Sequence, residues 1–306
     1  MKHFVAIADH TPDFLRHTLD VSKRLKKQLK ETGKNDPVLG GKTLAMIFEK
    51  QSLRTRVSFH VGMVQLGGAA MMLRGEEMGW GKREEIRDVA RVLASMCNGV
   101  MARTFEHEKL NQLAKFSNVP VINGLTDYNH PCQAMADVMT IEEKFGKLAG
   151  LSMAFIGDGN NVARSLASAC GKFGMRFTIA APGGYAWSQD DVDHIMGKVP
   201  GLDLVTTSDP IEAVREADVV VTDTWVSMGQ EAEKERRVKD FAGFQVDDKL
   251  LKNAPKHAVV LHCLPAYRGL EISDEVIEGP RSLVFQEAEN RLHFQKGLMA
   301  VLIGGM

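Results

Sequence analysis

A short polar segment between two apolar runs has the residue types of an anion-binding site. The segment, Gln51–Arg56, follows the apolar run Thr43–Phe48, which is typical of a buried strand, and precedes apolar residues spaced for one face of a helix. A hydroxyl at such a helix start can cap the helix, whose first N–H groups then point outward with partial positive charge. Arg54 adds a planar guanidinium that can hold two phosphate oxygens. The segment by itself fits a solvated basic helix start equally well, so other parts of the sequence are needed to distinguish this interpretation from an anion site.

Two further candidates, Arg103 and His130, each come just after a predicted strand. The predicted strands are 99–103 and 120–124. Strands that alternate with helices indicate a parallel α/β sheet, whose ligand site lies beyond the carboxyl ends of the strands. We therefore expect Arg54, Arg103 and His130 to lie in one crevice.

The turn at 157–162 has the start of a dinucleotide-binding fingerprint but not its remaining parts. Val162 stands where the fingerprint needs a third glycine, and no acid follows the next strand, which runs into 180–183. A dehydrogenase is therefore disfavoured. The amides of Asn160 and Asn161, together with the helix start, could hold a carboxylate, although plain turn chemistry explains the same residues.

Two polar segments follow predicted strands later in the chain. Asp223 and Ser227 are spaced to grip an ammonium group by charge and hydrogen bonds, although an N-cap is an equal alternative. Cys263 follows a buried strand, where a small cysteine is often only a core residue, and His262 is by itself more often structural than catalytic. No activating base for a nucleophilic cysteine can be assigned from spacing.

The bulk properties exclude several classes of protein. A net charge of −1 gives no sign of attraction to nucleic acids or membrane surfaces. No apolar run reaches the roughly 18 residues of a membrane-spanning helix. The four cysteines fit neither a disulfide framework nor a paired metal motif. The first residues show no signal-peptide pattern, and we expect a cytoplasmic protein.

The chain is long enough for two domains, because single cores seldom grow past about 250–300 residues. We predict an α/β protein of two similar-sized domains, each a mostly parallel sheet flanked by helices. The first is expected over residues 1–131, completed by a C-terminal helix at 290–306; an interdomain helix at 132–147 leads to the second domain at 148–289. The segment 74–82 is expected to be a Gly-rich charged loop of the kind that often carries function. The other predicted strands are 69–73, 151–157, 177–180, 202–206, 218–222 and 258–261.

Taken in order, several segments resemble the ornithine carbamoyltransferases, a branch of the aspartate/ornithine carbamoyltransferase superfamily. The resemblance covers essentially the whole chain, and the SMG and HCLP elements separate this branch from the aspartate carbamoyltransferases. The segments are FEK-x-S-x-RTR at 48–56, Arg103, HPCQ at 130–133, D-x-x-x-SMG at 223–229 and HCLP at 262–265.

The resemblance implies a role for each matching residue. The residues assigned to carbamoyl phosphate are Ser52, Leu53, Arg54, Thr55, Arg103, His130, Gln133, Cys263, Leu264 and Arg291. The residues assigned to ornithine are Asn161, Asp223, Ser227 and Met228, and the catalytic groups are Arg103, His130, Cys263 and Asp223.

The resemblance also implies the reaction and the assembly. The expected activity is transfer of the carbamoyl group from carbamoyl phosphate to the δ-amine of L-ornithine, giving L-citrulline and phosphate. No metal or organic cofactor is expected. A homotrimer with sites at subunit interfaces is expected, with larger assemblies left open. The alternatives are a carbamoyltransferase acting on N-acylated ornithine or putrescine, and a non-catalytic amino-acid-binding protein on the same fold.

Two positions depart from the family pattern. Leu53 stands where the family usually has Thr, so one hydroxyl contact to phosphate is lost while the backbone N–H remains. Glu77 stands where the family often has Gln or His that reaches a neighbouring subunit's phosphate, and a carboxylate there would repel a dianion. Either the loop is shifted, or Lys82 or Arg83 makes that contact.

Overall fold

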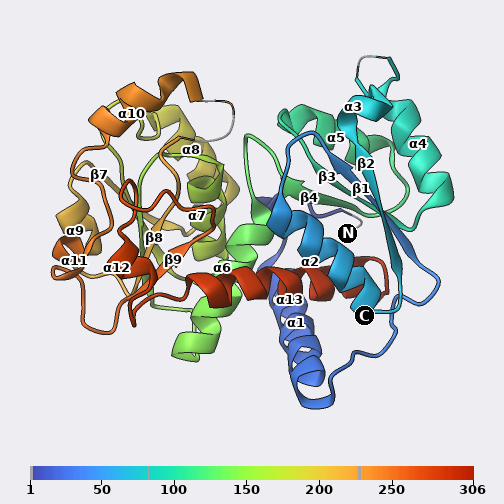
Figure 1. Cartoon of the computed structure of the whole chain (residues 1–306), viewed down its shortest axis with the longest axis horizontal. Coiled ribbons are helices and arrows are strands. Elements are labelled where there is room, and N and C mark those ends of the chain that lie inside the picture. Colours follow the sequence, from blue (N-terminus) through green and yellow to red (C-terminus); the bar gives the residue numbers. More distant parts are fainter. Residues whose placement is uncertain (1–2, 82, 227–228, 230) are drawn as a thin grey trace. The chain divides into compact units, whose positions relative to one another are not determined.

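The computed structural model divides the chain into two compact units (Figure 1). The first comprises Met1–Met139 and Glu289–Met306, and the second comprises Thr140–Ala288. The chain enters the second unit within helix α6 (Pro131–Phe145) and returns within helix α13 (Val284–Leu302). The structure describes residues 3–81, 83–226, 229 and 231–306.

The first unit is built on a four-stranded parallel sheet of order β2-β1-β3-β4. The middle of β1 and all of β3 are buried, as expected for strands covered by helices on both faces. Since the strands are parallel, their carboxyl ends share one edge, and Phe48 at the end of β1 pairs with Arg103 at the end of β3. The strands are β1 (Thr43–Phe48), β2 (Ala69–Arg74), β3 (Gly99–Arg103) and β4 (Val121–Leu125).

The helices of this unit begin and end at residues suited to those positions. The Thr11 side chain accepts a hydrogen bond from the amide of Phe14 to cap α1, and Gly33 ends that helix in the left-handed conformation. Besides α6 and α13, the unit holds η1 (Ile7–Asp9), α1 (Pro12–Thr32), α2 (Leu53–Gln65), α3 (Gly75–Met78), α4 (Ile86–Met96) and α5 (His107–Phe116).

The second unit repeats the architecture with five parallel strands of order β7-β6-β5-β8-β9. The order reverses direction at β5, and the loops after β5, β8 and β9 emerge at one edge of the sheet, which is where doubly wound sheets bind ligands. The strands are β5 (Ser152–Ile156), β6 (Arg176–Ala180), β7 (Asp203–Thr207), β8 (Val219–Thr222) and β9 (Val259–His262). The helices are α7 (Asn161–Phe173), α8 (Gln189–Lys198), α9 (Pro210–Val214), η2 (Glu231–Glu233), α10 (Lys234–Asp240), α11 (Asp248–Leu251) and α12 (Asp274–Ile277).

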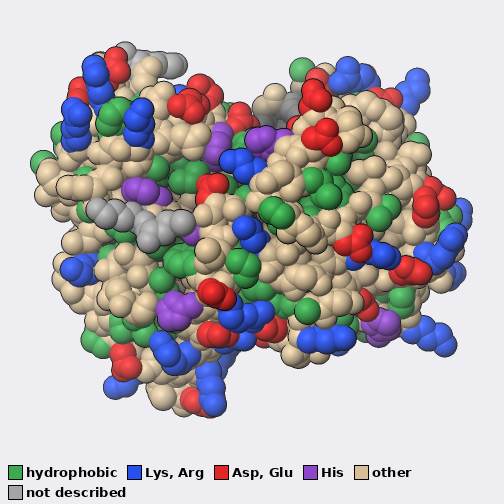
Figure 2. Space-filling model, turned by 180° about the vertical axis from the view of Figure 1, so that it is seen from behind, with side chains coloured by type: hydrophobic (Ala, Val, Ile, Leu, Met, Phe, Trp, Pro, Cys, Tyr) green, Lys and Arg blue, Asp and Glu red, His purple; other side chains and the backbone are tan. Residues whose placement is uncertain are grey.

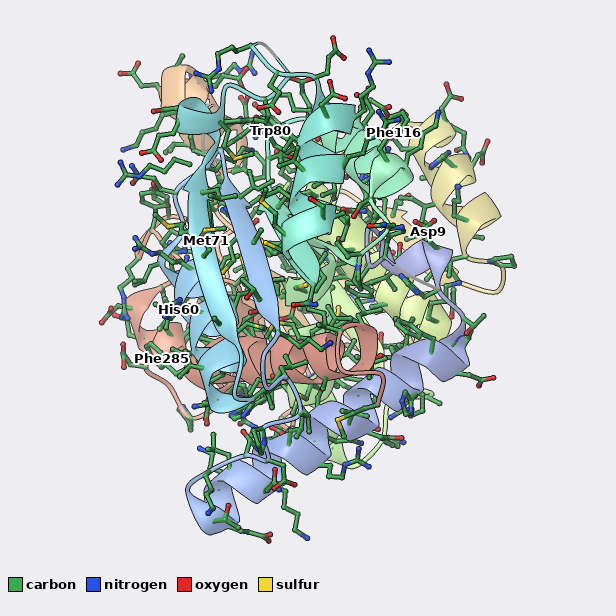
Figure 3. The ribbon with its side chains drawn as sticks, turned by 90° about the vertical axis from the view of Figure 1, so that its right-hand side faces the viewer. Asp9, His60, Met71, Trp80, Phe116 and Phe285 are labelled. Atoms are coloured by element: carbon green, nitrogen blue, oxygen red, sulfur yellow. The ribbon has the colours of Figure 1, made fainter. Side chains whose placement is uncertain are left out.

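The predicted fold class is confirmed, and each predicted strand is present with ends shifted by at most one or two residues. Two local predictions are wrong. The segment 74–82 contains the single helical turn α3, which is too short to show a helical period in the sequence. The last helix begins at Val284 and not at 290, and Phe285, labelled in Figure 3, lies in its first turn with 59% exposure.

A buried lysine joins three parts of the first unit. The Lys296 side chain on α13 is fully buried, and its Nζ donates to Asn35 Oδ1 at 2.7 Å and to Gln65 Oε1 at 2.9 Å. Both partners are neutral amides, so they do not offset the loss of hydration as a carboxylate would. Burial therefore lowers the pKa of Lys296 to about 8.

We predict that Lys296 makes the protein more stable at alkaline pH. The folded state loses the Lys296 proton near pH 8, whereas the unfolded state keeps it to its ordinary pKa of 10.5, so the free energy of unfolding rises between these values. Relative to Lys296→Met, the native protein should gain about 2 kcal/mol between pH 8 and pH 10 in urea unfolding. Lys147→Met, at an exposed site, is the matched control and should show no such gain. A constant difference between native protein and Lys296→Met across this range would contradict the assignment.

Candidate functional site

The start of α2 has the geometry of an anion site. Ser52 is extended, and its Oγ accepts the amide of Thr55 at 3.2 Å, so the hydroxyl cap predicted from the sequence is present. The helix is 13 residues long, and the first backbone N–H groups of its first turn have no intrahelical acceptor. Leu53, at the first helical position, is 74% exposed and offers a backbone N–H but no hydroxyl.

Arg103 and His130 lie at the same edge of the first sheet. Arg103 is the last residue of β3, and its carbonyl accepts the amide of Glu49 at 2.9 Å, just beyond the end of β1. His130 precedes α6, in the connection that follows β4. Both side chains are buried, with 6% and 5% exposure.

The pKa of His130 reflects its burial and the positive charges that act on it. Its pKa lies well below the ordinary value of 6.5, first because of burial and then because of the positive charges of Arg291, Arg103 and Arg54. The imidazole is therefore neutral at neutral pH and can donate a hydrogen bond from one ring nitrogen. The structure thus brings together the three residues expected in one crevice and adds Arg291.

Arg291 reaches this site from α13 and is held by side chains of two other helices. Its Nη1 donates to Gln133 Oε1 at 2.6 Å, and its Nη2 donates to Thr55 Oγ1 at 3.3 Å. Gln133 Nε2 in turn donates to Asp137 Oδ1 at 2.8 Å, which fixes the amide with its oxygen toward Arg291. The sequence analysis missed Asp137, a fully buried carboxylate one helical turn after Gln133, and the i, i+4 spacing is the signal that could have found it.

The α3 turn and the residues after it are held near the end of β1. Trp80 Nε1 and Lys109 Nζ both donate to Glu49 Oε1 at 2.9 Å. The Glu77 carboxylate lies 3.6 Å from the Arg74 guanidinium in an exposed ion pair. Of the two cations suggested in its place, Arg83 donates to the carbonyl of Met78 at 3.3 Å. The other, Lys82, lies outside the described residues.

Asp223 is the centre of a polar cluster in the second unit. It directly follows β8 and is 7% exposed. Its Oδ2 accepts Asn160 Nδ2 at 2.7 Å, and its Oδ1 accepts the amide of Thr224 at 2.7 Å and the thiol of Cys263 at 3.1 Å. A carboxylate held in this way is suited to a cationic ligand group.

The two asparagines after β5 have different tasks. Asn160 Oδ1 caps α7 by accepting the amides of Val162 at 2.9 Å and Ala163 at 3.0 Å, and its Nδ2 is bound to Asp223. Asn160 therefore has a local structural role at the turn, in line with the alternative of plain turn chemistry. Asn161, the first residue of α7, is half-buried and keeps its predicted ligand role as a proposal. Ser227 and Met228 lie outside the described residues.

Asp223, His262 and Cys263 place one possible metal-ligand atom each within 4.8 Å of one another. The two ring nitrogens of His262 already have partners, because Nδ1 accepts the amide of Leu264 at 2.9 Å and Nε2 lies 3.0 Å from Glu271 Oε1. A metal would have to break one of these bonds. The three residues are therefore a poor ligand set as they stand.

Arg237 connects two loops of the second unit and was not found from the sequence. It is 6% exposed, and its Nη1 donates to Asp158 Oδ2 at 2.6 Å and to the carbonyl of Trp225 at 3.1 Å. Burial raises the pKa of Asp158, and the Arg237 guanidinium opposes that rise. The KERRVKD stretch has the composition of a solvated helix, so no local signal distinguishes Arg237 from its neighbours.

On the face shown in Figure 2, acidic and basic side chains are interspersed, in keeping with the net charge of −1. Among the described residues, every helix is too short or too polar to cross a membrane.

Comparison with known proteins finds similarity along nearly the whole chain. Residues 2–143 match the family model for the carbamoyl-P binding domain of aspartate/ornithine carbamoyltransferase, and residues 149–302 match the model for its Asp/Orn binding domain. An ornithine carbamoyltransferase of Carboxydothermus hydrogenoformans is 50% identical over 306 residues, 99% of this chain and 98% of the relative. One of Anoxybacillus flavithermus is 49% identical over 304 residues, 99% of this chain and 96% of the relative. The solved ornithine carbamoyltransferase of Pyrococcus furiosus is similar in structure, with a TM-score of 0.95 and 44% identity, covering 100% of this chain and 98% of that one. Since the two family models and these relatives span nearly every residue, the chain belongs to the aspartate/ornithine carbamoyltransferase family.

Proposed function

We propose that this protein transfers the carbamoyl group of carbamoyl phosphate to the δ-amine of L-ornithine, producing L-citrulline and phosphate. The observation that carries the proposal is the convergence of Arg54, Arg103 and Arg291 on the buried, neutral His130. Three guanidinium groups that act on one neutral imidazole make this part of the first unit electropositive, which favours an anionic ligand. Carbamoyl phosphate supplies such an anion.

Carbamoyl phosphate is assigned to the first unit. The phosphate lies at the start of α2, where backbone N–H groups and the Arg54 fork meet its oxygens. Arg103 bridges phosphate and carbonyl oxygen, and His130 donates to the carbonyl oxygen from its neutral ring. The full set in this unit is Ser52, Leu53, Arg54, Thr55, Arg103, His130, Gln133 and Arg291.

The reaction is an acyl-type substitution at the carbonyl carbon. The deprotonated δ-amine attacks this carbon, and negative charge develops on the carbonyl oxygen. The bond between this carbon and the phosphate oxygen then breaks, and one proton of the amine passes to the departing phosphate, which is released as hydrogen phosphate. Donors already fixed in place, such as Arg103 and His130, stabilise the developing charge more than they stabilise the substrate. A free amine of this kind has a pKa near that of lysine, about 10.4, so the site has to bind the neutral form or remove a proton. Asp223 and Cys263 are the groups we assign to that task.

Ornithine is assigned to the second unit. Asn161 takes the α-carboxylate, and Asp223 with Ser227 and the Met228 backbone takes the amino-acid head group. Cys263 and Leu264 line the reacting centre, near the δ-amine and the carbamoyl group. The buried Asp223 carboxylate favours a ligand with a free ammonium group over an N-acylated ornithine. Putrescine has no carboxylate for Asn161.

We further propose that the protein is a cytoplasmic homotrimer. One face of α2 is exposed and largely apolar, because Leu53, Val57, His60 and Val64 recur at helical spacing. Met71, on the edge strand β2, is 45% exposed and is labelled with His60 in Figure 3. An open strand edge beside an apolar helix face is a surface that another subunit would cover. Sedimentation of the purified protein tests the assembly.

One substrate panel tests the proposed activity. Purified protein is given carbamoyl phosphate with L-ornithine, N-acetylornithine, putrescine or aspartate in turn, and the carbamoylated products are measured. Citrulline should form at a rate far above the other products. A preference for one of the other amines would replace ornithine in the proposal, and no product from any amine would favour a binding protein.

Arg54→Ala should reduce kcat/KM for carbamoyl phosphate by about 100-fold or more, because it removes a charged donor from the leaving group. Steady-state citrulline formation measures the effect, and circular dichroism checks that the variant is folded. Arg24→Ala, an arginine exposed on α1, is the matched control and should behave as the native protein. Near-normal activity of Arg54→Ala would refute the phosphate role.

Asp223→Asn should raise the KM for ornithine at least about tenfold, because the side chain keeps its size but loses the charge that pairs with an ammonium group. The Kd of carbamoyl phosphate, measured by calorimetry, should stay within about twofold, since Asp223 is not among the residues assigned to carbamoyl phosphate. Unchanged ornithine kinetics would remove Asp223 from the binding site.

A further inference from the structure

The turn at Cys263 and Leu264 has an unusual backbone conformation. Leu264 has a φ of 56°, in the left-handed region that non-glycine residues rarely adopt. Such a conformation persists only where the surrounding structure holds it in place, and it is often found at functional sites. The inference below rests on the proposed function, which puts this turn at the reacting centre.

The side chain of His262 holds this turn from within. The amide of Leu264 donates to His262 Nδ1 at 2.9 Å. A backbone N–H can only donate, so Nδ1 carries no proton, and the ring hydrogen must lie on Nε2. Nε2 then donates to Glu271 Oε1, which lies 3.0 Å away. Both side chains have no exposed surface, so water does not compete for these bonds.

Glu271 orients the histidine ring and joins it to the chain beyond the turn. Its Oε1 also accepts the amide of Tyr267 at 2.6 Å, while its Oε2 has no hydrogen-bond partner among the described residues. Burying a carboxylate with one oxygen unpaired is unfavourable for stability alone. The backbone amide of His262 is fixed separately, because it donates to Glu287 Oε2 at 2.9 Å.

We propose that His262, oriented by Glu271, is a positioning residue for the carbamoyl transfer. By accepting the Leu264 amide it fixes the left-handed turn, and the turn sets the direction of the Leu264 carbonyl and of the Cys263 thiol, which lies 3.1 Å from Asp223 Oδ1. His262 and Glu271 act through these groups and do not touch substrate.

A pair of neutral substitutions separates the two bonds of the ring. His262→Asn keeps an acceptor near the position of Nδ1, since an Asx side chain can accept the amide two residues on. His262→Gln keeps a donor near the position of Nε2 but offers no such acceptor. We expect kcat/KM for ornithine to fall at least about tenfold in His262→Gln and less than about threefold in His262→Asn. The Kd of carbamoyl phosphate should change less than kcat/KM for ornithine in both variants, because eight of its ten assigned residues lie in the first unit and do not depend on this turn.

The native protein, measured in the same assay, tests the proposed function separately. If it forms no citrulline, the proposed function fails; if it forms citrulline, the two variants test only the positioning role. Equal losses in the two variants, no loss in either, or a larger loss in His262→Asn would overturn the positioning role. If His262→Gln does not fold, Glu271→Gln and Glu271→Leu replace the pair. Glu271→Gln retains an oxygen acceptor and should stay near native activity, whereas Glu271→Leu should lose ornithine kcat/KM. Native kinetics in Glu271→Leu would likewise overturn the proposal.

Discussion

Mutual repulsion among buried positive charges is the constraint on which the first unit depends. Burial lowers the pKa of His130, and the positive charges of Arg291, Arg103 and Arg54 lower it further. All of these side chains except Arg54 are almost fully buried. Like charges in a low-dielectric site repel one another, so a rigid framework is needed to hold them near His130. That framework is the parallel sheet, since β1, β3 and β4 end at one edge and deliver Arg103 and the connections that carry Arg54 and His130. The dianion of the proposed substrate would offset this repulsion.

The return of the chain completes this cluster. Arg291 is 158 residues from Gln133 in the sequence, yet the two side chains are 2.6 Å apart because α13 brings the chain back to the first unit. In the second unit, polar residues also gather beyond the carboxyl ends of parallel strands, but there the central charge is negative. The ends of β5, β8 and β9 bring Asn160, Asp223 and Cys263 together around a carboxylate. The proposed sites for an anionic donor and a cationic acceptor thus both lie beyond the carboxyl ends of parallel strands.

Much of this could be predicted from the sequence, because the signals are local. Apolar runs marked the strands, and the rule that ligands bind beyond their carboxyl ends grouped Arg54, Arg103 and His130 correctly. A capping hydroxyl before α2 was also predictable, since Ser52 stands directly before the helical pattern. The short turn α3 was not, because four residues show no period.

The residues that hold the proposed site residues in place could not be predicted from the sequence, because their partners are distant along the chain. Arg237 lies in a run of charges, and only its distant partners Asp158 and Trp225 distinguish it. Glu271 lies nine residues from His262 with no motif between them that indicates contact. For Asn160 and Asn161 the sequence left two roles open, and geometry assigned the cap to Asn160.

The protonation of His130 tests the charge cluster most directly. Nuclear magnetic resonance of the labelled imidazole, with His130→Asn to assign the signal, would follow its titration first without ligand and then with inorganic phosphate. The account predicts a neutral ring at pH 6 without ligand, because the pKa lies well below 6.5, and a raised pKa once phosphate offsets the guanidinium charges. An imidazole that titrates near 6.5 and does not respond to phosphate would contradict the account.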